Sequence, residues 1–219
     1  MHELQAREEI CRIGASLYAR GYVHASAGNI SVKLDDGSFL ITPTDACLGN
    51  LISHELAHVA ADGTQLSGAR ASKTLTLHRS IYQAASPARC VIHTHATHLV
   101  SLTLQGVWRQ SDIVPPITPY YVMKVGHMPL VAYQRPGATS VATEVTQLIH
   151  TSTAQEKPIR GVMLDRLGPV VWHESPAQAS AVLEELEETA KLWLMSDRQA
   201  TALTDTQIQE LRETFGALW

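Results

Sequence analysis

Two turn sequences, set among amphipathic helices, constrain the fold of this chain most. Asp35-Asp36-Gly37 and Ala61-Asp62-Gly63 each lie between two short runs that read as strands. Asp-Gly pairs in such a setting favour tight turns that join antiparallel strands. Other strands alternate with helices along the rest of the chain. The predicted strands are residues 29–34, 38–42, 57–60, 65–67, 90–94, 130–133, 161–164 and 169–172, and the predicted helices are residues 7–20, 72–85, 96–104, 138–151, 176–195 and 205–215.

This interleaving predicts an α/β fold with three layers, in which helices cover both faces of a mixed, largely antiparallel sheet. With 219 residues the chain fits one main domain, and we expect it to span residues 1–195. Residues 196–219 read as a linker and a short tail helix, which could dock on its own subunit or on a neighbour. No Gly-x-Gly-x-x-Gly follows a strand, so a dinucleotide site is unsupported.

Composition narrows the class of protein. A formal net charge of −4 argues against a nucleic-acid partner. No apolar run reaches the length of a membrane span, and the first residues lack the pattern of a signal peptide. The three cysteines are scattered, so neither a disulfide framework nor a cysteine zinc site is expected. We therefore expect a cytoplasmic protein that binds a small molecule.

The eleven histidines are numerous, and two of them form a pattern. His93 and His95 stand two positions apart at the end of a predicted strand, so their side chains point to the same face. That arrangement allows two imidazoles to bind one metal ion, whereas a catalytic zinc site needs a third protein ligand. The alternative is a pair of ordinary histidines at a strand end.

Three further segments combine small residues with hydroxyl or amide donors. Gly28 and Asn29 precede a strand, Thr44 follows a Thr-Pro turn, and Ser72 and Lys73 stand at a predicted helix start. Helix N-termini and backbone nests attract phosphate and carboxylate groups. Each segment alone is an ordinary turn or cap, but together with the histidine pair they indicate a small anionic substrate.

These segments, in this order, resemble the class II aldolase/adducin family across residues 5–195. The matching residues are Gly28-Asn29-Ile30-Ser31, Thr42-Pro43-Thr44, Ala71-Ser72-Lys73, His78, His93-Thr94-His95 and Glu184…Glu187-Glu188. Within the family the chain is most similar to the branch that decarboxylates 3-oxo-tetronate 4-phosphate. Additional residues carry that similarity: Ser26-Ala27, Cys47-Leu48-Gly49-Asn50-Leu51, Thr118-Pro119-Tyr120-Tyr121-Val122-Met123, Arg135-Pro136-Gly137 and Thr189-Ala190-Lys191.

The resemblance implies an α/β/α sandwich assembled as a homotetramer, with active sites at subunit interfaces. It places Gly28, Asn29, Thr44, Ser72 and Lys73 at a phosphate group. His93 and His95 become ligands of a divalent metal, Zn²⁺ or alternatively Mn²⁺. Lys73 and Thr74 fall at catalytic positions, and Tyr120 or Tyr121 aligns near a tyrosine that serves as proton donor.

Two positions depart from the family pattern. Thr74 stands where the family has a glutamate, and Leu167 stands where it has a third metal histidine. Neither side chain can replace the lost group at neutral pH. Another histidine can complete the site, with His127 as the first candidate and His98 as the second. Alternatively, the metal is held weakly, or the chain has lost both metal and catalysis.

The resemblance implies a carbon–carbon lyase that acts on a small phosphorylated 3-keto sugar acid. Decarboxylation next to a ketone needs no base to remove a C–H proton, so loss of the glutamate harms it less than it harms an aldolase. A sugar-phosphate aldolase is therefore the second reading. A non-catalytic adducin-like binding protein is the third.

Overall fold

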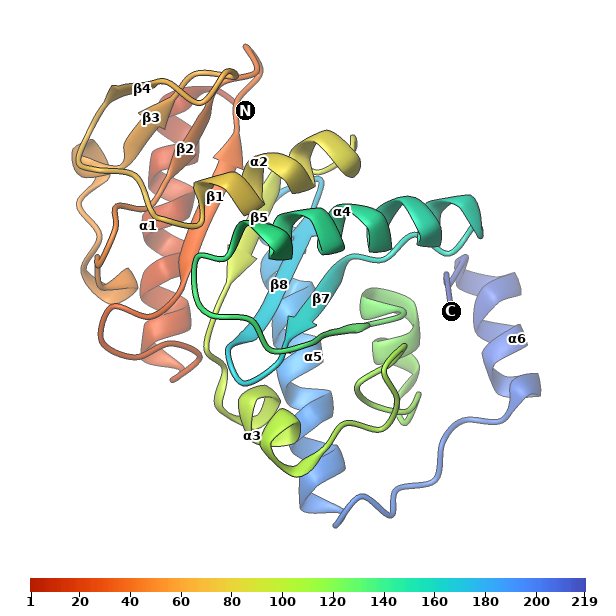
Figure 1. Cartoon of the computed structure of the whole chain (residues 1–219). Helices are drawn as coiled ribbons and strands as arrows, with labels where there is room; N and C mark the ends of the chain where they lie inside the picture. The colour runs from red at the N-terminus through yellow and green to blue at the C-terminus, as the bar shows by residue number, and fades with distance from the viewer.

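The computed structural model describes residues 1–219, and its centre is one eight-stranded sheet. The strands lie in the order β4-β3-β2-β1-β5-β8-β7-β6 (Figure 1). All neighbouring strands are antiparallel except β6 and β7, which are parallel. The strands are β1 (Asn29–Lys33), β2 (Phe39–Ile41), β3 (Ala57–Val59), β4 (Gln65–Ser67), β5 (Cys90–His93), β6 (Leu130–Val131), β7 (Gly161–Leu164) and β8 (Gly168–His173).

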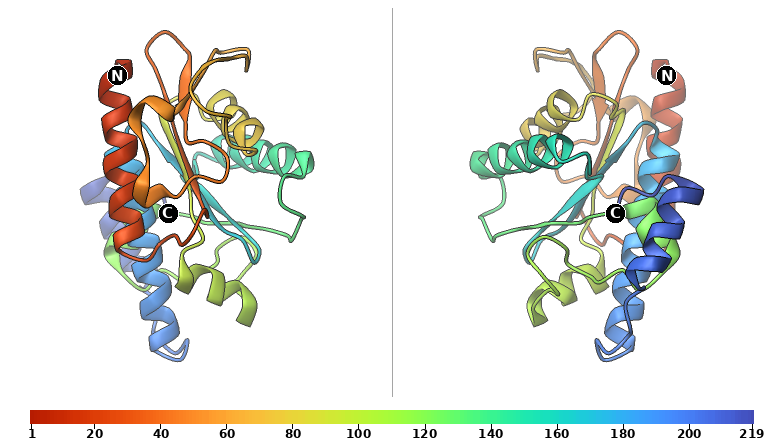
Figure 2. Two further views of the ribbon diagram at one scale, coloured as in Figure 1. Left: turned by 90° about the vertical axis from the view of Figure 1, so that its left-hand side faces the viewer. Right: turned by 90° about the vertical axis from the view of Figure 1, so that its right-hand side faces the viewer.

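Helices form the two outer layers. The helices α1 and α5 cover one face of the sheet, and α2 and α4 cover the other (Figure 2). An apolar core fills the space on each side. The bounds of the helices are α1 (Glu3–Ala19), α2 (Leu75–Ala84), α3 (Thr97–Gln105), α4 (Thr139–Ala154), α5 (Pro176–Met195) and α6 (Asp205–Phe215). The predicted three-layer α/β/α sandwich with a mixed, largely antiparallel sheet is confirmed.

The alternation of side chains along β5 separates core from site. Ile92 points into the core beneath α1 and α5, whereas Val91 belongs to the core beneath α2 and α4. Since side chains two positions apart share a face, His93 faces the α2 and α4 side as well. Ser31 of β1 lies on that side, against His78 of α2. The polar residues of the candidate site therefore gather on one face of the sheet.

Most elements lie where the sequence predicts them, and the differences fall at their ends. The helix α2 begins at Leu75, three residues after the predicted start, and β5 ends at His93, one residue early. Three short helical turns were not predicted. They are the 3₁₀ turns Leu48–Asn50 and Ser53–Glu55 and the π-helical turn Tyr121–Val125.

The tail helix α6 packs on its own chain. Ile208 and the last residue, Trp219, are buried in the larger of the two cores. The ring of Trp219 stacks on His127, with 4.5 Å between the ring centroids. A capping box at Thr204 starts the helix, as its side chain and that of Gln207 each accept from the other's backbone. No helix in the molecule combines the length and apolar character needed to cross a membrane.

Candidate active site

Backbone hydrogen bonds bring the three predicted anion-binding segments together. The amide of Thr42 donates to the carbonyl of Ile30 over 3.0 Å, and that of Ser72 donates to the carbonyl of Thr42 over 3.2 Å. Thr44 donates to the carbonyl of Arg70 over 2.9 Å. Segments that are more than forty positions apart in the sequence therefore form one corner at the ends of β1, β2 and α2. We refer to this region as the phosphate corner.

Gly28 sits where no other residue fits without strain. Its φ angle is +83°, and a Cβ atom there would lie 2.8 Å from the carbonyl oxygen of His93 and 2.9 Å from Val23 Cγ1. Glycine alone adopts that φ at no cost and tolerates this approach. The next residue, Asn29, pairs with His93 across β1 and β5. This close packing sets the phosphate corner directly beside the histidine pair.

A buried chain of hydrogen bonds orients Asn29. His78 Nε2–H donates to Asn29 Oδ1 over 2.6 Å, which leaves His78 Nδ1 as an acceptor. Ser31 Oγ donates to that nitrogen over 2.7 Å, and the Tyr82 hydroxyl donates to Ser31 Oγ over 2.7 Å. Burial, with a smaller contribution from nearby His93, lowers the pKa of His78 to about 3, so the ring is neutral. Because Asn29 Oδ1 is occupied, the amide nitrogen is the group left to donate to an anion.

Replacing His78→Ala tests this chain. The substitution removes the acceptor of Ser31 and the donor to Asn29, and it leaves a space under α2. We expect the free energy of unfolding to fall by about 2–4 kcal/mol, because two buried polar groups lose partners and a cavity forms. Urea denaturation measures the loss. His54→Ala, at an exposed histidine, is the control and should change stability by less than about 0.5 kcal/mol.

The rings of His93 and His95 lie together, with 5.1 Å between their centroids. His93 is buried, and its Nδ1–H donates to the carbonyl oxygen of Pro169 over 2.9 Å. Burial lowers the pKa of His93 to about 4, and the neighbouring His95 adds to the shift. Burial also lowers the pKa of His95, and the nearby ring of His24 lowers it further. Both rings are therefore neutral near pH 7, and Nε2 of His93 keeps its lone pair, as in many metal-binding histidines.

The donor set around this pair stops at two imidazoles. No group of three or more His, Cys, Asp or Glu side chains in the chain is arranged to hold a metal ion. The ring of a further histidine, His24, lies 6.1 Å from that of His95, measured between the ring centroids. Leu167 lines the same pocket as His93 but offers only methyl groups. The residues fit an ion held by His93 and His95 with open positions, not a closed three-histidine site.

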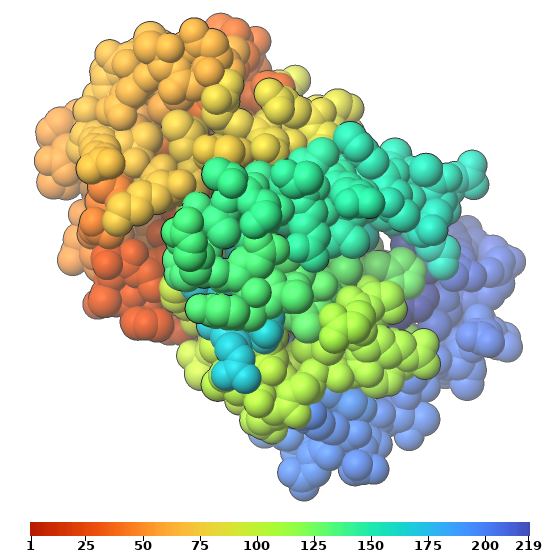
Figure 3. Space-filling model, in the orientation of Figure 1, coloured from red at the N-terminus to blue at the C-terminus, as the bar shows by residue number.

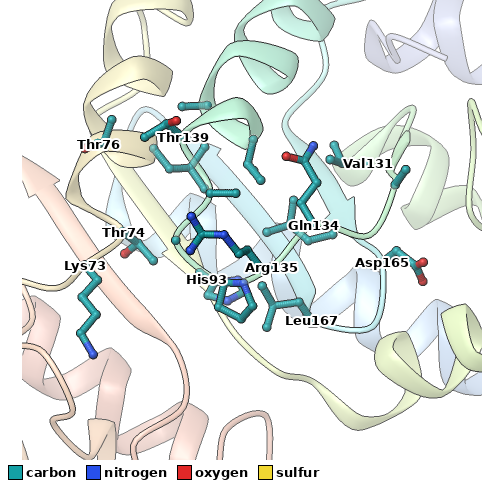
Figure 4. Close-up of a pocket in the computed structure, with 18 residues that line it drawn as sticks. Lys73, Thr74, Thr76, His93, Val131, Gln134, Arg135, Thr139, Asp165 and Leu167 are labelled. Carbon is teal, nitrogen blue, oxygen red and sulfur yellow. The ribbon is translucent and has the colours of Figure 1, made fainter.

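A pocket opens at this point, between α2, α4 and the end of β5 (Figure 4). Lys73 and Thr74 of the phosphate corner line it, together with His93. Figure 3 shows this face of the molecule, where α2 and α4 lie over the sheet. Arg135 also lines the pocket, and the sequence had not marked it as a site residue.

His127, the first candidate for a third metal ligand, lies elsewhere in the chain. Its Nδ1–H donates to Asp112 Oδ1 over 2.8 Å, and its ring is stacked against Trp219. It lines a different hollow, between the loop before β6 and α4. One ring face and one nitrogen of His127 thus have partners away from His93. The structure does not bring His127 to the histidine pair within one chain.

His98, the second candidate, is committed to Glu187. The His98 Nδ1–H donates to Glu187 Oε1 over 2.7 Å, and the backbone amides of His98 and Leu99 also donate to this buried carboxylate. Glu187 therefore caps the N-terminus of α3, since an anionic acceptor stabilises free amides there. The acidic run of α5 has a structural role at this residue.

The two neighbouring tyrosines differ in accessibility. Tyr121 is fully buried, whereas Tyr120 is 59% exposed. Neither lines the pocket that contains His93. Of the two side chains, only that of Tyr120 is accessible, and it lies outside the pocket that His93 lines.

Together, the fold and the site indicate a carbon–carbon lyase. Comparison with known protein families then shows which family this is. A family model described as the class II aldolase and adducin N-terminal domain matches residues 8–194. The chain belongs to the class II aldolase and adducin family.

Particular relatives are similar over almost the whole chain. A 3-oxo-tetronate 4-phosphate decarboxylase of Cupriavidus necator is 57% identical and covers 99% of both chains. A protein of the same name from Escherichia coli K12 is 43% identical over 96% of both chains. The crystal structure of YgbL from Escherichia coli, described as an aldolase, epimerase or decarboxylase, superposes with a TM-score of 0.88. It is 42% identical and covers 96% of this chain and 99% of that one.

Proposed function

We propose that this protein is a carbon–carbon lyase that decarboxylates a 3-oxo-tetronate 4-phosphate. The observation that carries the proposal is the 57% identity to the Cupriavidus necator decarboxylase over 99% of both chains. The pocket supports it, because Lys73 for a phosphate and the neutral imidazole of His93 for a ketone both line it, and His95 lies beside His93. The substrate has one group for each.

The phosphate corner anchors the substrate. Lys73 supplies the positive charge, and Thr44, Ser72 and Asn29 supply hydroxyl and amide donors. The hydrogen bonds that order the corner and Asn29 reduce the conformational entropy lost on binding. Anchoring the phosphate places the adjacent ketone near His93, since Asn29 and His93 are paired across the strands.

The reaction breaks the bond between the carboxylate and C2. The electron pair of that bond moves to C2–C3 as carbon dioxide leaves, and negative charge develops on the C3 oxygen. A proton then adds to C2 and gives dihydroxyacetone phosphate. No C–H bond needs to be broken by a base, so Thr74 in place of a glutamate does not block this reaction. Donors aimed at the C3 oxygen contribute most, because that is where charge develops.

A divalent metal is part of the proposal. His93 and His95 would hold it, and an ion bound there would polarise the ketone oxygen. Zn²⁺ suits imidazole ligands, and Mn²⁺ is the alternative. With two protein ligands the ion is held weakly, so added metal should stimulate the purified protein.

The direct test is decarboxylation of synthetic 3-oxo-tetronate 4-phosphate. We expect carbon dioxide and dihydroxyacetone phosphate in equal amounts, at a rate well above the spontaneous loss from a protein-free blank. A coupled assay for dihydroxyacetone phosphate and a manometric assay for carbon dioxide measure the two products. A rate equal to the blank, with and without Zn²⁺ or Mn²⁺, would refute a catalytic role.

The non-catalytic reading remains the alternative, and Thr74 and Leu167 are the residues that favour it. In that case the protein binds the sugar phosphate in the same pocket but shows no turnover. Binding without turnover distinguishes the two. Cleavage of a sugar phosphate without loss of carbon dioxide would instead indicate an aldolase.

Assembly as a homotetramer and a cytoplasmic location are further parts of the proposal. The exposed Tyr120 supports an assembly, because it can act on a substrate only if the site is shared between copies. Light scattering of the purified protein measures the molar mass and tests the assembly.

A further inference from the structure

A tight turn fixes the position of Arg135 at the mouth of the pocket. The amide of Ala138 donates to the carbonyl of Arg135 over 3.1 Å, and Gly137 has a φ angle of +80°. Proline in the second position and glycine with positive φ in the third are typical of a type II turn. This rigid Arg-Pro-Gly-Ala turn links β6 to α4 and determines where the arginine side chain begins.

Arg135 has no anionic partner in the chain. It takes part in none of the ion pairs, and the same is true of Lys73. Asp165 is the only carboxylate among the pocket residues, and it is paired with neither. In the view of Figure 4, the guanidinium of Arg135 and the amino group of Lys73 are drawn apart from each other, and the ring of His93 lies between the Arg135 and Lys73 labels. The pocket thus presents two separate, unpaired cations.

We propose that Arg135 binds the carboxylate of the substrate and so selects a keto acid phosphate over a sugar phosphate that lacks a carboxylate. This inference rests on the proposed function. A 3-oxo-tetronate 4-phosphate carries its phosphate at C4, its ketone at C3 and its carboxylate at C1. Lys73 lies in the phosphate corner, His93 adjoins that corner, and Arg135 lines the same pocket as both, so the pocket offers one group for each of the three. A guanidinium binds a carboxylate through two parallel hydrogen bonds, a geometry that lysine cannot supply.

The same contact has a consequence for the reaction. The carboxylate loses its charge as carbon dioxide leaves, so a cation bound to it stabilises the substrate more than the transition state. Arg135 is therefore a specificity residue, and its loss should raise KM without lowering kcat.

Two stable analogues separate the roles of the cations. Erythronate 4-phosphate keeps the carboxylate and the phosphate and has an alcohol in place of the ketone. Erythritol 4-phosphate differs from it only in a neutral C1 alcohol. Isothermal titration calorimetry of both compounds, with the wild type and with Arg135→Gln, gives the four dissociation constants. Arg135→Lys, Lys73→Gln and Arg12→Gln complete the set, the last at an exposed residue of α1 on the opposite face.

We expect Arg135→Gln to weaken the binding of erythronate 4-phosphate by about 10–100-fold, since hydrogen bonds between charged groups contribute on that scale. Erythritol 4-phosphate should change by less than about 3-fold. Arg135→Lys should recover part of the lost affinity. Lys73→Gln should weaken the binding of both compounds, whereas Arg12→Gln should change the binding of neither.

Equal losses for the two compounds in Arg135→Gln would overturn the inference, because the arginine would then act on the phosphate or on the fold. No loss for either would also overturn it. If the wild type binds neither compound, the proposed function itself fails, and the inference with it. If both bind and only the Arg135 pattern is absent, the proposed function stands without this role.

Discussion

Leu167→His should increase the metal affinity of this protein by more than about 100-fold. Residue 167 lines the same pocket as His93, and the family pattern places its third metal histidine there. A third imidazole would convert a pair of ligands into the three-ligand set of catalytic zinc sites. The loss of an outer partner alone changes metal affinity by about 10–100-fold, so the gain of a direct ligand should exceed that range. Dialysis against buffered Zn²⁺, followed by elemental analysis, measures the change.

Leu167→Met is the matched control. It keeps an apolar side chain of similar volume and supplies only a weak thioether acceptor. Co²⁺ provides a second readout, since its visible absorption reports tetrahedral coordination independently of activity. If Leu167→His holds no more metal than Leu167→Met, residue 167 does not face the ion position beside His93 and His95. Adding Thr74→Glu to Leu167→His tests the other departure from the family pattern.

His93→Ala should lower kcat/KM for decarboxylation by about 100–1000-fold, the usual cost of removing one group that stabilises developing charge. His93 is buried and adjoins the phosphate corner, so it lies where the proposed function places the ketone of the substrate. The effect should fall mainly on kcat, because Lys73 and Asn29 still bind the phosphate. Steady-state kinetics with the keto acid separates the two constants.

His150→Ala, at an exposed residue of α4, should leave the kinetics unchanged. Urea denaturation of His93→Ala is needed alongside, because the substitution also removes the hydrogen bond to Pro169. A folded His93→Ala protein with wild-type kcat would contradict the position assigned to the ketone. A rise in KM with kcat unchanged would indicate that His93 mainly binds the substrate.

Local signals predicted the fold well. The Ser175-Pro176 pair predicted the start of α5, and the hydroxyl of Ser175 does cap that helix. The two-residue spacing of His93 and His95 predicted that their rings share a face, although β5 ends before His95. These features depend on neighbours within a few residues, so they are visible in the sequence.

Features that depend on distant partners were not visible. The position of His127 shortly after the tyrosine segment makes it a candidate for the third metal ligand. In the structure it follows the π-helical turn Tyr121–Val125, and its ring contacts Asp112 and Trp219 instead. His98 is hydrogen-bonded to Glu187, which is 89 positions away in the sequence. Arg135 was noted only as part of a motif, although its Pro-Gly turn signals a fixed loop. Nothing in the sequence shows that this loop borders the pocket.

The relay from Tyr82 through Ser31 and His78 to Asn29 runs in one direction, because each group donates to the next. Hydrogen bonds in such a series polarise one another, so a charge that arrives at one end strengthens them all. An anion at Asn29 would thus influence the phenol of Tyr82, which is a buried residue of α2 and does not touch the anion. Tyr82 is consequently a natural internal reporter of occupancy, readable in its hydroxyl proton resonance without any added label.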